Sequence, residues 1–482
     1  MSALRRLLAV AGAGALTAAC TAVGPNYRLP EGAVVNAPAA KAAFVGADFA
    51  AVNQAPVPDD WWRLYDDPVL DGLVEQALAA NADLRVAAAN LERAQAAVRE
   101  TVAAGEPQGG LSATAARDQA SGESFLLPHA LPAENLADAG FKVSYQIDLF
   151  GRLRRAAEAA KADADASQAA LEAARVTTAA ETARAYVEAC SAGEQAAAAG
   201  RLLDLQQRAV SVAERMERAG RGAPIDVLRA KAQADQLRAE PPVFEAQRRA
   251  ALYKLAVLTG KPPAEFPKSV AACSRPPAPS GPIPVGDGAG LLKRRPDVRQ
   301  AERVLAGSTA RIGVAVAALY PSVSLGLSAG ATGLLADIGQ PATQRWSFGP
   351  LISWTFPGGG ERARIAEAEA GQKAALARFD GVVLNALRET ETGLTLYAHD
   401  LDRHAALKAA RDEAAQAADQ ARRLYTAGRS PYLSGLDAER SLAAAESALA
   451  ASDARLSLDQ VNLFLALGGG WSGGGQAGAT KG

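Results

Sequence analysis

Two segments of this 482-residue chain change from strand-like to helix-like patterning within a few residues. The first is VSYQIDLFGRLRRAAEAAKA (143–162) and the second is LISWTFPGGGERARIAEAEA (351–370). Each alternates apolar and polar residues, passes a Phe and one or more Gly, and continues as an Ala/Arg/Glu-rich helix. The side-chain period therefore changes from 2 to about 3.6 residues at two places. Such a chain must join strands to long helices twice.

Other parts of the chain are also repeated. Residues 81–107 resemble residues 295–321, and AGRGAPIDVL (219–228) resembles AGRSPYLSGL (427–436). Self-similarity at a fixed distance indicates an internal duplication. Each half is predicted to run helix, strand, loop, strand, very long helix, break, second long helix. The expected segments are a signal peptide (1–19), an N-terminal extension (20–60), repeat 1 (61–262), a Pro/Gly-rich linker (263–290), repeat 2 (291–467) and a flexible Gly-rich tail (468–482).

The N-terminus has the layout of a secretory signal. Arg5 and Arg6 precede an apolar run over 7–19, which is too short to span a membrane as a helix. Cys20 follows small residues, as the lipid acceptor of bacterial lipoproteins does, so we expect covalent lipid on Cys20; the alternative is an ordinary signal with an incidental Cys. Cys190 and Cys273 look solitary, and we expect no disulfide between them, although an exported chain permits one.

Four stretches of about ten residues alternate between apolar and polar residues: 109–118, 141–149, 322–329 and 345–356. Aromatic residues such as Trp346, Trp354 and Phe356 lie near their ends. This pattern is typical of transmembrane β-barrel strands, although a half-buried soluble sheet gives the same alternation. The Ala-rich helices offer such a sheet few apolar partners, which favours a barrel. The connecting loops, about 119–139 and 333–343, would then lie outside the cell.

The strand count sets the expected stoichiometry. Four strands cannot close a barrel, and two chains would give eight, whose interior is filled by side chains. Three chains give twelve strands around a polar lumen, so a homotrimer is predicted. The long helices, expected over about 152–219 and 361–427, would each reach about 100 Å into the periplasm. Their Ala-rich seams need other helices to pack against, and an elongated coiled-coil rod is the alternative.

Several kinds of site are disfavoured. The 51 Lys and Arg balance 52 Asp and Glu, so nothing indicates a nucleic-acid partner. His399 and His404 are five residues apart, which does not place them on one helix face as a metal pair. PGGG (357–360) lacks the Lys-Ser/Thr of a phosphate-binding loop. No catalytic constellation is visible, so we expect no enzyme, and no cofactor besides lipid on Cys20.

Six motifs occur in order: CTAVGPNY, WWRLYDDPVLDGLVEQALAANADLRVA, YQIDLFGRLRRA, LLKRRPDVRQAE, ALYPSVSL and LDAERSLAAAE. In these motifs the chain resembles the TolC-type outer-membrane efflux proteins, specifically their NodT- and OprM-like lipoprotein branch. The resemblance implies an α+β membrane protein: a trimer whose twelve-stranded transmembrane β-barrel continues into a twelve-helix periplasmic α-barrel. It also implies docking to a periplasmic adaptor protein and to an inner-membrane pump of the resistance-nodulation-division (RND) class.

The resemblance also implies a narrow periplasmic end with acidic side chains near the constriction. In AGRSPYLSGLDAERS (427–441), Asp437 matches the aspartate of the family's LDA motif, while Ser434 stands where some relatives carry an acid. The corresponding positions in the first repeat are Arg229 and Asp226. Opposite charges within about 4 Å could link the helix ends in a closed state. Alternatively, Asp226 and Asp437 simply belong to helix starts.

Together with the strand and helix pattern, the resemblance implies a passive exit duct for drugs and other small toxic compounds, lipid-anchored in the outer membrane and extending into the periplasm. A type I protein-secretion channel and a pore-free coiled-coil adaptor or scaffold are the alternatives. The predicted barrel-to-tunnel junctions are Phe150 with Gly151, and Phe356 with Pro357 and Gly358. The two Phe side chains would end the lipid-facing surface, and the glycines would give the backbone room to turn.

Overall fold

The computed structural model describes residues 22–356 and 358–469, which form two compact units. The described part of unit 1 contains residues 22–30, 90–167, 300–356 and 358–379, and that of unit 2 contains residues 31–89, 168–299 and 380–469. Each unit therefore draws segments from both predicted repeats. The predicted signal segment 1–19, Cys20, Pro357 and residues 470–482 of the predicted tail lie outside the described residues.

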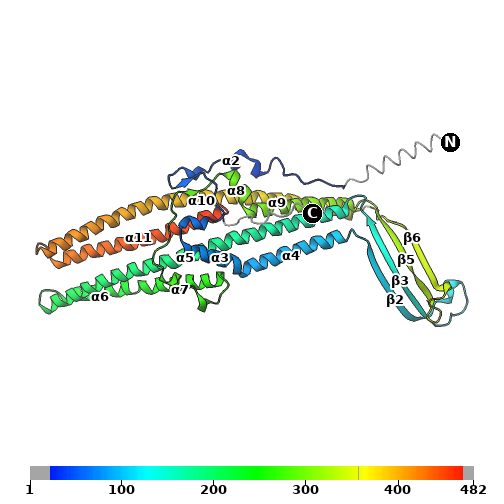
Figure 1. Ribbon diagram of the computed structural model, residues 1–482, viewed down its shortest axis with the longest axis horizontal. Coiled ribbons are helices and arrows are strands. Elements are labelled where there is room, and N and C mark those ends of the chain that lie inside the picture. Colours follow the sequence, from blue (N-terminus) through cyan, green and yellow to red (C-terminus); the bar gives the residue numbers. More distant parts are fainter. Residues whose placement is uncertain (1–21, 357, 470–482) are drawn as a thin grey trace. The chain divides into compact units, whose positions relative to one another are not determined.

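Unit 1 contains one antiparallel four-stranded sheet, in the order β2-β3-β5-β6 (Figure 1). The strands are β2 (Gln108–Asp118), β3 (Glu134–Ile147), β5 (Ser322–Leu334) and β6 (Gln344–Ser353). The register pairs Lys142 with Gly110 on one side and with Ser328 on the other. Strands β2 and β6 have no neighbour on their outer sides within the described chain, so both sheet edges are open.

The two faces of the sheet differ as the alternation predicts. One face carries apolar side chains such as Tyr145, Leu327 and Phe348, and the other carries small and polar ones such as Ser328 and Ser347. The apolar face is uncovered in this chain: Trp346, Phe348 and Ile352 are 64–79 % exposed. Within the described residues, no helix makes an extensive contact with the sheet.

The predicted strand boundaries need correction. Strand β3 begins at Glu134 rather than at 141, so the first loop spans only 119–133 and contains the 3-10 helix η4 (Gly122–Phe125). Residues 134–140 do not alternate clearly between apolar and polar residues, because small residues occupy positions 137, 139 and 140. Residues 136–140 nevertheless pair with both β2 and β5. Strands β3 and β6 also end two or three residues earlier than predicted, at Ile147 and Ser353.

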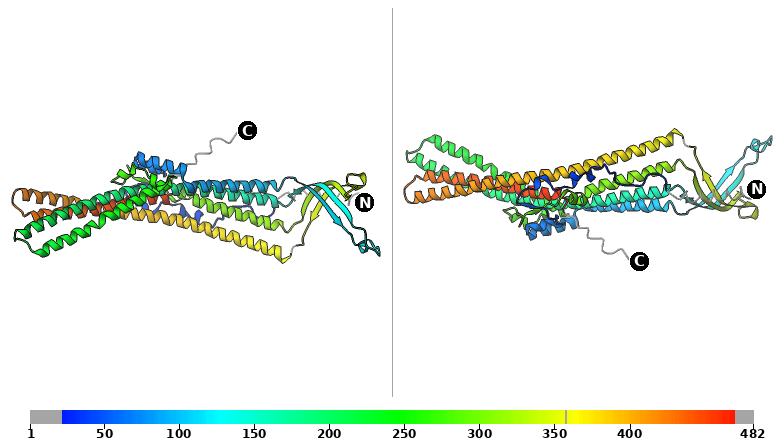
Figure 2. Two further views of the ribbon diagram at one scale, coloured as in Figure 1. Left: turned by 90° about the horizontal axis from the view of Figure 1, so that it is seen from below. Right: turned by 90° about the horizontal axis from the view of Figure 1, so that it is seen from above.

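The long helices lie where the sequence predicts them. Helix α5 (Arg152–Arg218) has 67 residues and α10 (Gly359–Thr426) has 68, about 100 Å each. Each is followed by a break and a second helix lying alongside it, α6 (Pro224–Arg238) and α11 (Tyr432–Ala466) (Figure 2). The other helices are α2 (Pro38–Lys41), α3 (Pro68–Ala80), α4 (Ala82–Ala103), α7 (Glu240–Leu258), α8 (Gly288–Arg294) and α9 (Pro296–Ala317). None of the helices in the described residues is apolar over a length sufficient to cross a membrane.

Unit 2 has its hydrophobic core around the middle of α5. Its buried residues Ala179, Ala183, Tyr186 and Cys190 recur at three- and four-residue spacing, as a packed helix face requires. Trp61, in the 3-10 helix η3 (Trp61–Tyr65), is fully buried and stacks on Phe464 of α11 with ring centroids 4.6 Å apart. Near this core, the short strand β1 (Val52–Asn53) pairs in parallel with β4 (Ile283–Pro284). Unit 2 also contains the 3-10 helices η1 (Val34–Asn36), η2 (Val45–Ala47), η5 (Pro263–Glu265) and η6 (Val270–Ala272). The 3-10 helix η7 (Pro341–Thr343) belongs to unit 1.

The expectation that Cys190 and Cys273 remain unpaired is wrong. The two residues form a disulfide that joins α5 to the segment after η6, with Cα atoms 4.8 Å apart. The linker can approach the helix because residue 193 is Gly: a Cβ there would lie 2.5 Å from the carbonyl oxygen of Cys273. The pairing depends on where the linker crosses the helix, which the sequence pattern does not specify.

Candidate functional site

The predicted aperture residues come together at the ends of the helix pairs in unit 2. A groove with a volume of about 730 Å³ lies between α5, α6 and α11. Apolar and small residues form most of its lining, and its charged members are Asp226, Arg229, Asp437 and Arg440. The structure thus brings together three of the four predicted residues. Ser434 is exposed on α11 but does not line the groove.

Asp226 and Asp437 both lie near the first turns of their helices. Pro224 is the first residue of α6, and Asp226 lies in its first turn, where a carboxylate is stabilised by the positive end of the helix dipole. Asp437 lies one turn inside α11, which begins after Pro431. Within the described chain, no ion pair of 4.0 Å or less joins Asp226 or Asp437 to Arg229 or Arg440. The groove therefore presents two unpaired carboxylates beside two guanidinium groups.

The first strand-to-helix junction is tightly built. Asp148 caps α5 by accepting hydrogen bonds from the backbone N–H groups of Leu153 (3.1 Å) and Arg154 (3.0 Å). Phe150, three residues beyond the end of β3, stacks on Tyr320 with ring centroids 4.5 Å apart. Gly151 has φ +76°, a conformation that favours glycine, and a Cβ there would lie 2.4 Å from Ala22.

The second junction follows the same plan with different contacts. Glu361 accepts a 2.9 Å hydrogen bond from the backbone N–H of Gly358 at the start of α10. Phe356 also lies three residues beyond its strand, but it is 78 % exposed and contacts Trp354 at 4.8 Å between ring centroids. The Trp354 indole N–H donates to the carbonyl oxygen of Leu319 at 3.1 Å. The two Phe residues occupy equivalent positions, but Phe150 is packed against Tyr320 whereas Phe356 is exposed.

The N-terminal residues 22–27, which we call the strap, pack against the first junction within unit 1. The buried Arg155 donates hydrogen bonds to the carbonyl oxygens of Val23 (3.1 Å) and Gly24 (3.2 Å) and to Asn26 Oδ1 (2.7 Å). The backbone N–H of Val23 donates to the carbonyl oxygen of Phe150 at 3.1 Å. The strap is therefore fixed where β3 gives way to α5.

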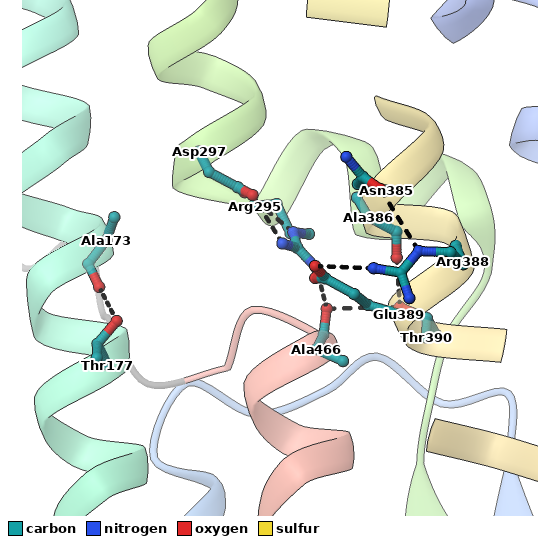
Figure 3. Close-up of polar contacts among 10 residues, drawn as sticks. All are labelled: Ala173, Thr177, Arg295, Asp297, Asn385, Ala386, Arg388, Glu389, Thr390 and Ala466. Carbon is teal, nitrogen blue, oxygen red and sulfur yellow. Dashed lines mark hydrogen bonds and ion pairs between the residues drawn. The ribbon is translucent and has the colours of Figure 1, made fainter. Parts of the chain in front are cut away.

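Arg295, in the KRRPD segment, has a structural role in unit 2. Its guanidinium binds Asp297 at 2.7 and 2.9 Å, Glu389 at 2.9 Å and the carbonyl oxygen of Ala466 at 2.9 Å (Figure 3). Burial disfavours its charge, but the carboxylates of Asp297 and Glu389 outweigh burial and raise the pKa of Arg295. The contacts tie the start of α9 to α10 and α11 beside a pocket of about 460 Å³. Figure 3 also shows Thr390 bridging to Ala466.

A pair of carboxyl groups lies between α10 and α11. Burial, followed by the neighbouring Asp400, raises the pKa of Asp459 to about 7. Burial disfavours the charged form of Asp400, but the hydrogen bonds with Asp459 and with Arg455, which donates to Asp400 Oδ2 at 2.5 Å, outweigh burial and lower the pKa of Asp400. His404 instead pairs with Asp453 at 2.7 Å. In the described part of the chain, no group of three or more His, Cys, Asp or Glu residues is arranged to hold a metal ion.

Several residues of these sites were not predicted from the sequence. Arg440 lines the groove, yet its counterpart in the first repeat is Ala232, so comparing the repeats does not draw attention to it. Tyr320 was noted only as part of ALYPSVSL, although an aromatic residue before a strand could have suggested a junction contact. The disulfide also had a signal: once Cys20 is assigned to lipid, an even pair remains in an exported chain.

Comparison with known proteins gives consistent matches. The family model "Outer membrane efflux protein" matches residues 73–261 and 290–469. Nodulation protein T of Rhizobium leguminosarum bv. trifolii is 30 % identical over 374 residues, covering 77 % of this chain and 78 % of that protein. Outer membrane protein OprJ of Pseudomonas aeruginosa is 30 % identical over 468 residues, covering 95 % and 94 %. The solved structure of the outer-membrane channel OprN has a TM-score of 0.84 and 35 % identity, covering 93 % of this chain and 99 % of that one.

Proposed function

Because the chain belongs to the outer membrane efflux protein family, we propose that it forms the exit duct of a three-component export system. It is an efflux channel of the outer membrane, not an enzyme, and it extends into the periplasm. The energy for transport comes from an inner-membrane pump of the RND class, reached through a periplasmic adaptor. The cargo is drugs and other small toxic compounds.

The four-stranded sheet carries this proposal. One face is apolar and uncovered, the other is polar, and both edges are open. An uncovered apolar face suits lipid, and open edges require further strands. Three copies of the chain supply twelve strands and close a barrel with a polar interior, whereas two copies supply eight and leave no room for a duct.

The long helices supply the periplasmic part of the proposed duct. In the trimer, α5 with α6 and α10 with α11 contribute to a twelve-helix periplasmic tunnel whose end docks the adaptor. The two stretches matched by the family model, 73–261 and 290–469, support an origin by internal duplication. The junction residues Phe150, Gly151, Phe356, Pro357 and Gly358 mark where each half passes from barrel to tunnel.

Covalent lipid on Cys20 provides a second anchor. Cys20 is two residues from Ala22, so the lipid attaches within about 7 Å of the strap that Arg155 holds. The strap lies at the end of β3, where the sheet, and therefore the membrane-spanning part, ends. The acyl chains would enter the inner leaflet of the outer membrane at this level.

The function is tested with the purified full-length protein and with a deletion strain. We expect a trimer in detergent, discrete conductance steps in planar bilayers, capture of an adaptor by crosslinking in cells, and severalfold greater drug sensitivity after deletion. A monomer without conductance would support the pore-free scaffold instead. Unchanged drug sensitivity together with a lost secreted protein would favour type I protein secretion.

The aperture proposal assigns the groove charges Asp226, Arg229 and Asp437, with Ser434 at the neutral position, to the periplasmic constriction. Within the described residues of one chain no short ion pair joins these opposite charges, so closing links would join different protomers. Exposed links contribute about 0.2–1 kcal/mol each, and a trimer repeats each of them three times.

Replacing Asp226 and Asp437 together by alanine should increase the ratio of open to closed channel roughly tenfold, because several weak links are lost at once. Single-channel recording in planar bilayers measures this ratio. Ser434→Ala is the matched control, since Ser434 is exposed and outside the groove lining, and it should leave gating unchanged. Unaltered closed times in the double variant would contradict the aperture assignment.

A further inference from the structure

The polar face of the sheet in unit 1 is lined mainly by small uncharged residues. Following the register across the four strands, this face carries Ser112, Thr114, Gly140, Ser144, Ser324, Gly326, Ser328, Gly330, Ser347 and Gly349, among others. Short side chains leave the lumen of a barrel wide. Any long charged side chain on this face therefore has a large influence on what passes it.

The charges on this face fall into three groups along the strands. Asp118 and Glu134 are paired in register at the end that joins the first loop. Further along, Asp138 is held by Arg345 at 2.7 and 3.0 Å and accepts a hydrogen bond from Thr332. Asp138 and Arg345 neutralise each other, so this second group adds no net charge.

Lys142 is the third group, and its charge is not compensated. Its cross-strand neighbours are Gly110 and Ser328, its side chain is exposed, and it has no hydrogen-bond or ion-pair partner in the described residues. Asp138 lies four residues away, about 14 Å along the strand. That distance exceeds the Debye length of about 8 Å at physiological salt, so the field at this level is positive.

Nothing beyond Lys142 reverses this sign before the strands end. The remaining polar-face residues toward the helix junction, such as Ser144, Gln146 and Ser322, carry no charge. Asp148, the next acid along the chain, caps α5 and lies 3.4 Å from Arg154. An ion in the lumen beside Lys142 would thus meet a positive side chain with no nearby carboxylate.

We propose that Lys142 is the charge-selecting residue of the barrel. The inference rests on the proposed trimer, in which three Lys142 side chains form one positive ring around the lumen. Such a ring attracts anionic solutes and slows cationic ones, as rings of Lys or Arg do in anion-conducting pores. The duct would therefore favour small anions and anionic export compounds at this level.

The test is the reversal potential of single channels in planar bilayers under a KCl gradient near 0.1 M, where screening is limited. Lys142→Gln should lower the chloride-to-potassium permeability ratio roughly twofold, and Lys142→Glu roughly fourfold, because three like charges are removed or reversed. Both shifts should shrink near 1 M KCl, where the Debye length is about 3 Å. The matched control is Arg345→Gln with Asp138→Asn, which removes two charges of opposite sign and should leave the ratio unchanged.

The outcomes separate the inference from the proposed function. Channels whose permeability ratio does not change in either Lys142 variant would overturn the role of Lys142 and leave the duct intact. A wild-type protein that forms no channels would overturn the proposed function and this inference with it. If the Lys142→Glu variant does not insert into the bilayer, the permeability ratio of Lys142→Gln alone tests the inference, because that variant introduces no acidic side chain.

Discussion

Replacing Cys190 and Cys273 together by alanine should lower the free energy of unfolding of unit 2 by about 2–4 kcal/mol. The disulfide closes a loop with a sequence separation of 83 residues, and removing so long a crosslink restores much conformational freedom to the unfolded chain. In the folded state the variant also loses the anchor that holds the linker on α5. Thermal and denaturant unfolding in detergent, followed by circular dichroism, measure the effect.

Two controls sharpen this experiment. Treating the wild-type protein with a reductant under unfolding conditions should reproduce the loss without any mutation. Ser191→Ala changes the neighbouring residue, whose buried hydroxyl has no hydrogen-bond partner, and should not lower stability. Equal stability of the double variant and the wild type would show that packing around Gly193 alone holds the linker.

The parts of the fold that depend on local periodicity could be predicted from the sequence. Helices α5 and α10 end within two residues of their predicted positions, since uninterrupted Ala-rich segments specify a helix wherever they lie. The apolar faces of β5 and β6 were also assigned correctly, because Leu327 and Phe348 alternate with Ser328 and Ser347. Both signals act over a few residues.

The parts that depend on tertiary placement could not be predicted in the same way. Residues Glu134–Gly140 form the start of β3 because β2 and β5 flank them, not because of their own pattern. Cys190 meets Cys273 because the linker crosses α5 at Gly193. In each case a partner distant in sequence supplies the contact, and only the folded chain specifies the partner.

The candidate site was predicted in part for a related reason. The resemblance to the family's LDA motif pointed to Asp437, and aligning the repeats then pointed to Asp226 and Arg229; all three line the groove. The alignment could not point to Arg440, which has no charged counterpart in the first repeat, or to the difference between Phe150 and Phe356. Duplication preserves positions, whereas the environment of each copy depends on the surrounding chain.

Trp61→Ala should have an equally large effect, lowering the free energy of unfolding of unit 2 by about 3–5 kcal/mol. Trp61 is fully buried, stacks on Phe464 with an interplanar angle of 15°, and contacts Trp62 and Tyr65 edge-on. Alanine would leave a cavity where η3 meets the end of α11. Thermal unfolding in detergent and the amount of protein in the outer membrane are the measurements.

Trp61→Phe separates packing from polarity at the same position. The indole N–H of Trp61 is buried without a hydrogen-bond partner, so phenylalanine removes an unsatisfied donor while keeping an aromatic ring against Phe464. Its cost should be only about 1–2 kcal/mol, and Val45→Ala, at a residue 90 % exposed, should cost less than about 0.5 kcal/mol. If Trp61→Ala were no more destabilising than Trp61→Phe, the ring stack would not hold η3 against α11, and other contacts of this core would do so.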